Sequence, residues 1–230
     1  MEKTGITENV KRILAEIGPG VTLCAATKMN DAARVREAIA AGVKVCGENR
    51  VQEMLDKYAQ GAYEGAELHF IGHLQKNKVK NVVGLVSLIQ SVDSLSLLDA
   101  IDAEARKKSV VQSVLLEINI GREASKSGFS PEEIPAAVEH ASALESIRVE
   151  GLMCIPPICL DPAENRPYFA EMHKIFVDID VEKYDNISMS LLSAGMSGDY
   201  LEAVSCGSNM IRVGSGIFGP RHYNSPEVQP

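Results

Sequence analysis

The sequence has few cysteines and no pattern that would pair them. Its five cysteines are an odd number in 230 residues, and no two of them form a Cys-x-x-Cys motif. Three of them fall within or at the ends of apparent strands. This usage is typical of reduced thiols in a cytoplasmic protein and does not indicate a disulfide framework.

Long apolar runs and excess positive charge are also missing. Residues 1–18 read as an amphipathic helix with charges throughout, unlike a signal peptide, and no stretch reaches the length of a membrane span. The net charge is −8, so nucleic acids and anionic membranes would be repelled. We therefore expect a cytoplasmic protein that binds neither nucleic acid nor membrane.

Several signatures of catalysis and metal binding are absent. There is no Walker A motif and no G-x-S-x-G elbow. His69 and His73 are four residues apart, but they lie across a strand and its exit, where the ligand spacing of a helical zinc site does not apply. We expect no metal site.

Strand-like and helix-like segments alternate along the whole chain. Because strands that alternate with helices pair in parallel, and no linker-like segment divides them, eight such units favour an α/β fold of the (β/α)8 TIM-barrel class. We expect one domain over residues 1–230, with an extra N-terminal helix and a flexible tail from about 224 to 230. The expected strands are 21–27, 43–47, 67–72, 85–90, 110–120, 147–154, 186–193 and 209–214.

Two glycine-rich turns follow the last two expected strands, "SAGMSGD" (193–199) and "RVGSGIFG" (212–219). The second has G-x-G-x-x-G spacing, but a dinucleotide site also needs a further strand and a distant acid, and the chain ends at Pro230. Barrels often bind phosphate with the loops after strands seven and eight. Simple tight turns remain the alternative.

Lys28 follows the first expected strand and would face these turns across the barrel mouth. A lysine amine that is partly removed from water shifts toward the neutral form, which condenses with aldehydes. An aldehyde and a phosphate together suggest pyridoxal 5'-phosphate (PLP), with Arg212 at the ring nitrogen. The alternatives are a solvated Lys28 and an ion pair between Arg212 and a strand-end acid such as Glu48.

Seven motifs, in order and over nearly the whole chain, resemble the pyridoxal-phosphate homeostasis protein family, which has an alanine racemase-like barrel. They are "ATK" (26–28), "GENRVQE" (47–53), "HFIGHLQKNK" (69–78), "SKSGF" (125–129), "GLMCIPP" (151–157), "LSAGMSGD" (192–199) and "IRVGSGIFGPRHY" (211–223).

The resemblance implies roles for particular residues. Lys28 is similar to the Schiff-base lysine and Lys126 to a loop lysine implicated in cofactor exchange. Many members have a second lysine where this chain has Asn30, which puts the exchange route in question. Gly198 stands where an acid is common. The cofactor-binding set that the resemblance implies is Lys28, Asn49, Ser193, Met196, Ser197, Arg212, Gly214 and Ser215.

The resemblance thus implies a carrier that holds PLP as a lysine Schiff base and serves intracellular PLP homeostasis and delivery, without strong catalysis of its own. We expect a monomer, with transient contact to PLP-dependent apo-enzymes. One alternative is an amino-acid racemase, which needs a second base that Tyr200 or Tyr223 would have to supply. Another is a Schiff-base aldolase or isomerase acting on a phosphorylated substrate.

Overall fold

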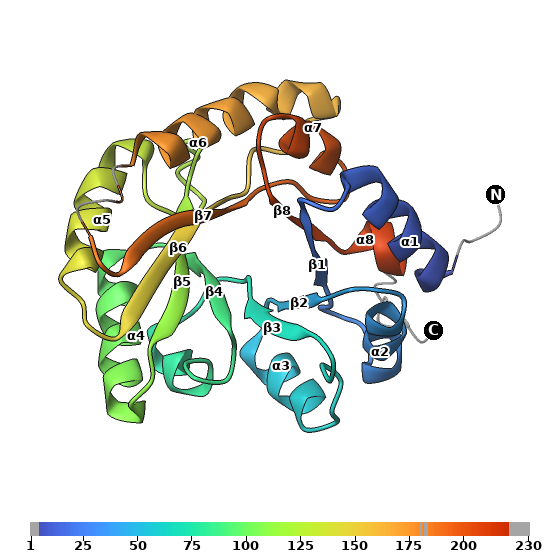
Figure 1. Cartoon of the computed structure of the whole chain (residues 1–230), viewed down its shortest axis with the longest axis horizontal. Helices are drawn as coiled ribbons and strands as arrows, with labels where there is room; N and C mark the ends of the chain where they lie inside the picture. Colours follow the sequence, from blue (N-terminus) through green and yellow to red (C-terminus); the bar gives the residue numbers. More distant parts are fainter. Residues whose placement is uncertain (1–4, 180, 182–183, 221–230) are drawn as a thin grey trace, which may run out of the picture.

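The computed structural model describes residues 5–179, 181 and 184–220. The expected tail at about 224–230, together with Tyr223, lies outside the described residues. Eight parallel strands pair in sequence order and close into a barrel, with β1 next to β8 (Figure 1), so the expected (β/α)8 fold is confirmed. The strands are β1 Thr22–Ala26, β2 Val45–Glu48, β3 Glu67–Phe70, β4 Leu88–Val92, β5 Gln112–Ile118, β6 Ile147–Cys154, β7 Ile187–Ser193 and β8 Met210–Val213.

Helices surround the ring of strands (Figure 1). The segment Lys76–Asn81 forms the 3-10 helix η1, and β4 runs two residues beyond the expected strand 85–90, so that it includes Ser91. The α-helices are α1 Ile6–Ile17, α2 Ala32–Ala40, α3 Val51–Tyr58, α4 Leu95–Lys108, α5 Ile134–Ser142, α6 Arg166–Asp178, α7 Tyr200–Ser205 and α8 Ser215–Phe218, and the 3-10 helices are η1 Lys76–Asn81, η2 Pro131–Glu133 and η3 Pro162–Asn165.

Local sequence signals explain where several helices begin. Asp31 caps α2 by accepting a 2.9 Å hydrogen bond from the backbone N–H of Arg34. Ser130 and Glu133 form a capping box at the turn that leads into α5, with Pro131 at the first helical position. Both devices satisfy backbone N–H groups that have no partner within the helix.

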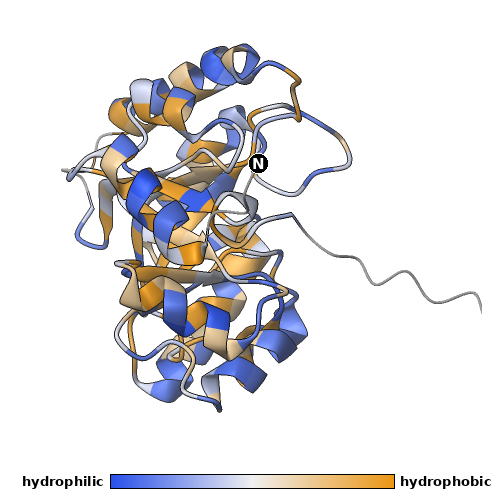
Figure 2. Cartoon of the chain, turned by 90° about the vertical axis from the view of Figure 1, so that its right-hand side faces the viewer, coloured by the Kyte–Doolittle hydropathy of each residue, from blue (hydrophilic) through white to orange (hydrophobic). Residues whose placement is uncertain are grey.

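Apolar side chains fill two regions. The larger lies between the strands and the helices, where α1 buries Val10, Ile13 and Ile17, and Figure 2 shows hydrophilic residues on the outward turns of the helices. The smaller lies inside the ring of strands and comprises two clusters, one with Cys24, Met210 and Ile71, which directly follows β3, and one with Leu88, Leu115 and Met153. This interior is packed and is not a pore, as is usual for barrels of this size.

No helix in the described part of the chain is long and apolar enough to cross a membrane. All five cysteines are free thiols. Burial raises the pKa of both Cys24 and Cys154 to about 12, so these two thiols stay protonated and unreactive at neutral pH.

Candidate functional site

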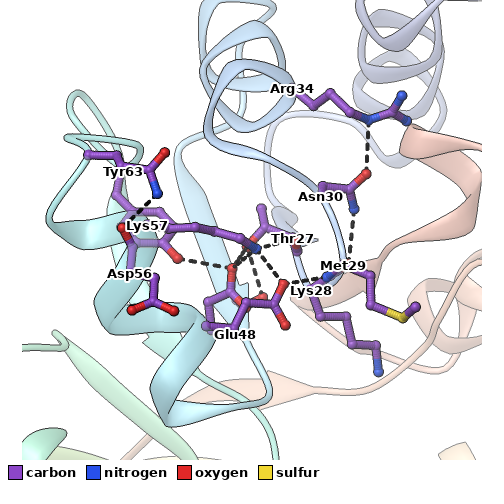
Figure 3. A network of polar contacts seen from close by, with 12 residues as sticks. Thr27, Lys28, Met29, Asn30, Arg34, Glu48, Asp56, Lys57 and Tyr63 are labelled. Atoms are coloured by element: carbon purple, nitrogen blue, oxygen red, sulfur yellow. Dashed lines mark hydrogen bonds and ion pairs between the residues drawn. The ribbon is translucent and has the colours of Figure 1, made fainter.

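Lys28 lies two residues beyond the end of β1, at the carboxyl end of the barrel. Side chains alternate along a strand, and Cys24 and Ala26 belong to the interior cluster. Lys28 is the next residue of the same parity, so this alternation, continued past the end of the strand, would direct it toward the barrel mouth. Figure 3 shows its side chain extending away from the polar cluster around Glu48 and Lys57.

The glycine turn after β8 lies directly against the end of β1. A Cβ atom placed on Gly214 would be 3.4 Å from both Cβ and O of Ala26, two residues before Lys28. The pairing of Cys24 with Arg212 and of Ala25 with Val213 sets this register. The fold therefore places the segment that carries Lys28 beside the predicted phosphate turn.

Ser197 connects the two glycine-rich turns. Its Oγ accepts hydrogen bonds from the backbone N–H groups of Gly214, at 3.3 Å, and Gly216, at 3.1 Å. These N–H groups point at one oxygen atom, which is the arrangement that also suits a phosphate oxygen. Ser215 lies exposed between them. The structure thus brings together Ser197, Gly214 and Ser215 from the residues that the sequence predicted for an anion site.

The turn after β7 owes its shape to an acid that the sequence analysis did not select. Buried Asp199 accepts a 2.7 Å hydrogen bond from the backbone N–H of Met196 and a 2.9 Å bond from Asn165 Nδ2. The N–H of Met196 is therefore engaged by Asp199. A polar residue three positions after Met196 in a glycine-rich turn is the sequence signal that was available.

Arg212 is buried at the base of the mouth. It donates from Nη1 to Ser193 Oγ at 2.6 Å and from Nη2 to the carbonyl oxygen of Cys154 at 2.7 Å. Burial lowers the pKa of Arg212 below its ordinary value, although a guanidinium stays charged at neutral pH. The alternative pairing of Arg212 with Glu48 is wrong, because in the described structure Glu48 pairs with Lys57.

A chain of polar side chains crosses the barrel interior from Arg212. Ser193 Oγ donates to Gln90 Oε1 at 2.7 Å, and Gln90 Nε2 lies 2.9 Å from His69 Nδ1. Burial lowers the pKa of His69, which favours the neutral ring. His69 is therefore part of the support beneath Arg212, and the described residues contain no cluster of three or more metal-ligating side chains.

Asn49 occupies the turn between β2 and α3. Its Oδ1 is buried and has no hydrogen-bond partner within the described structure. A Cβ atom on Gly72 would lie 2.3 Å from the Asn49 carbonyl oxygen and 2.6 Å from its Cα, so glycine at 72 lets the two backbones touch. A buried acceptor without a partner is costly, and a bound molecule that donates a hydrogen bond would remove this cost.

The family resemblance linked two positions, Lys126 and Asn30, to cofactor exchange, and the two residues have different surroundings. Lys126 is exposed in the loop after β5, next to Ser127, whose Oγ lies 3.4 Å from His73 Nδ1. Asn30 donates from Nδ2 to the Lys28 carbonyl oxygen at 3.0 Å and accepts from Arg34 Nε at 3.0 Å. Asn30 thus braces the Lys28 turn, a role that sequence reasoning did not foresee.

Comparison with known proteins agrees with this geometry. The family model for the N-terminal domain of alanine racemase matches residues 3–222. The pyridoxal phosphate homeostasis protein of Aquifex aeolicus is 38% identical, with 95% of this chain and 96% of that protein covered. Its counterpart in Pseudomonas aeruginosa is 34% identical, with 96% of this chain and 98% of that protein covered.

A solved structure shows the same fold with a ligand. PipY of Synechococcus elongatus with PLP bound is 32% identical and superposes with a TM-score of 0.84, covering 93% of this chain and 100% of that one. The chain therefore belongs to the alanine racemase N-terminal domain family and, within it, to the pyridoxal phosphate homeostasis proteins.

Proposed function

We propose that this protein binds PLP, attached covalently through Lys28, and holds it for intracellular homeostasis and delivery. The observation that carries the proposal is the contact between the end of β1, which leads to Lys28, and the turn at Gly214. In that turn the backbone N–H groups of Gly214 and Gly216 both donate to Ser197 Oγ. An amine beside an anion site suits a small molecule with an aldehyde and a phosphate.

The residues present fit such a ligand. The N–H groups of the two glycines would hold the phosphate together with the Ser197 hydroxyl, Arg212 would lie at the ring nitrogen, and the buried Oδ1 of Asn49 would accept a hydrogen bond from the ring substituents. When bound, PLP supplies an aldehyde and an electron-withdrawing ring. Because a guanidinium does not release a proton at neutral pH, Arg212 would leave the ring nitrogen unprotonated and the ring a weaker electron sink. PLP bound to the related PipY supports this assignment.

A carrier is favoured over a racemase by the surroundings of Tyr200, a candidate for the second base. Tyr200 is buried, and its hydroxyl donates to Glu16 on α1. This hydrogen bond holds the hydroxyl at the layer of helices around the barrel. Burial and the hydrogen bond to Glu16 raise the pKa of Tyr200, which disfavours the phenolate that a base would need. Residence in the cytoplasm as a monomer, with transient contact to PLP-dependent apo-enzymes, belongs to the same proposal.

The proposal is tested with purified protein loaded with PLP and dialysed. We expect retained ligand with the visible absorbance of a lysine-bound pyridoxal, and no sustained loss of optical activity when L-amino acids are added. Steady racemisation would replace the carrier by an enzyme. Failure to retain PLP, together with binding of a phosphosugar, would favour the aldolase alternative.

A further inference from the structure

A buried polar cluster lies between β2, α3 and the Lys28 turn, on the side away from the Lys28 side chain (Figure 3). At its centre Lys57, on α3, is 5% exposed and Glu48, on β2, is fully buried. Lys57 Nζ and Glu48 Oε1 are 2.7 Å apart. Glu48 Oε1 also accepts from Thr27 Oγ1 at 2.6 Å and from Tyr63 Oη at 3.0 Å.

A cluster of this kind needs a reason to persist. The free-energy cost of removing two charges from water can exceed the attraction between them. An apolar pair of similar volume is often at least as stable. A lysine on a surface helix ordinarily keeps its amine in water. Lys57 instead points inward, so the direction of its three N–H donors is the property to explain.

Those donors act on the backbone that carries Lys28. Lys57 Nζ donates to the carbonyl oxygen of Thr27 at 2.8 Å and to Glu53 Oε1 at 2.7 Å. Glu53 Oε1 in turn accepts the backbone N–H of Met29. The residues immediately before and after Lys28 are therefore both tied to one ammonium group.

The backbone at this point is unusual. Met29 has φ of 62°, in the left-handed region that residues with a side chain seldom occupy. Such a conformation persists where surrounding contacts determine it. The hydrogen bond from Met29 to Glu53 and the bond from Asn30 Nδ2 to the Lys28 carbonyl oxygen supply those contacts.

We propose that Lys57 is a positioning residue for Lys28: through Thr27 and Glu53 it fixes the backbone on both sides of Lys28 and so aims the amine at the aldehyde of the ligand. This inference rests on the proposed PLP function and adds a specific residue to it. It also separates two tasks, since Lys57 governs formation of the bond at Lys28 and the glycine turns govern the grip on the phosphate.

The test compares two ligands that differ at one group. PLP carries an aldehyde that can bond to Lys28, whereas pyridoxine 5'-phosphate carries a hydroxymethyl group there and can only be held by its ring and phosphate. The wild-type protein must first be shown to form a covalent bond between Lys28 and PLP. If it does not, the proposed function fails before any variant is compared.

Glu53→Ala is the main variant, because Glu53 is 23% exposed and its loss should leave the barrel folded. We expect the rate of bond formation with PLP to fall at least about tenfold, since a misplacement of about 1 Å can lower a rate about a hundredfold. The dissociation constant for pyridoxine 5'-phosphate should stay within about twofold of wild type. Glu53→Gln, which keeps an oxygen for Met29, should restore most of the rate. Gln52→Ala, on the same helix, is the matched control.

The double variant Glu48→Gln with Lys57→Met tests the centre of the cluster without leaving a lone buried charge. It should slow bond formation at least as much as Glu53→Ala does. Equal weakening of both ligands in the two variants would mean that the cluster only supports the fold, and unchanged rates would mean that Lys28 is aimed without it. Either result would overturn the inference.

Discussion

Glu117 should make the stability of this protein fall as the pH rises. The residue lies on β5 and is 9% exposed. Burial, and next the charge of Asp93, raise the pKa of its carboxyl from 4.5 to about 7, and the opposing charges of Arg212 and His73 do not cancel this effect. Each pH unit between those two values is worth about 1.4 kcal/mol. Ionising Glu117 in the folded barrel therefore costs about 3 kcal/mol in total.

The sign follows from proton binding. Below pH 4.5 Glu117 is protonated in both the folded and the unfolded chain, so it carries no penalty. Between about 4.5 and 7 the folded protein holds the extra proton, and its stability drops as pH increases. Above about 7 the carboxylate is charged in both states and the full penalty remains.

Urea unfolding of wild type and Glu117→Gln at pH 5 and pH 8 measures this penalty. Because the amide cannot ionise, we expect the variant to gain about 2 kcal/mol on wild type between the two pH values, most of the full effect. Glu145→Gln, at an exposed position before β6, should show no such gain. A constant difference between wild type and Glu117→Gln at the two pH values would refute the raised pKa of Glu117.

Two further substitutions test other parts of the site. Ser197→Ala removes the hydroxyl on which the N–H groups of Gly214 and Gly216 converge; we expect PLP retention in equilibrium dialysis to weaken about tenfold, the worth of one hydrogen bond to a charged group, and an unchanged affinity would argue against this anion site. Gly72→Ala places a Cβ atom 2.3 Å from the backbone of Asn49; we expect a loss of about 1–3 kcal/mol in urea unfolding, as in other overpacked cores. Gly198→Ala, which meets nothing within 4 Å, is its control, and equal stability of the two variants would contradict the tight contact.

The order of strands and helices could be predicted because its signals are local. An apolar run such as 21–27 and a cap such as Asp31 act within a few residues, and β1 and α2 form where these signals indicate. Their alternation then restricts the topology to parallel strands with right-handed crossovers. The carboxyl-end position of Lys28 follows from the same rule.

Contacts between distant residues could not be predicted in this way. Glu48 was recognised as a strand-end acid and considered as an alternative partner of Arg212, but its partner is Lys57. On α3 both Met54 and Lys57 are buried, three residues apart on one face. That spacing was a usable signal, yet a lysine on such a face is usually assigned to solvent.

The polar chain beneath Arg212 also depends on closure of the barrel. Gln90 and Ser193 are 103 residues apart in sequence, yet Gln90 Oε1 and Ser193 Oγ lie 2.7 Å apart. Only the shear of the closed barrel brings β4 and β7 to the same level. No local pattern in "LVSLIQ" or "NISMSLLS" encodes this register.

The most direct test is to locate the bond between protein and cofactor. The PLP-loaded protein is reduced with borohydride, digested, and its peptides are mapped by mass spectrometry. The account predicts a single pyridoxyl group on Lys28, and its loss in Lys28→Ala. A pyridoxyl group on Lys57 or Lys126, or one that persists in Lys28→Ala, would contradict the assignment of Lys28 and the site built around it.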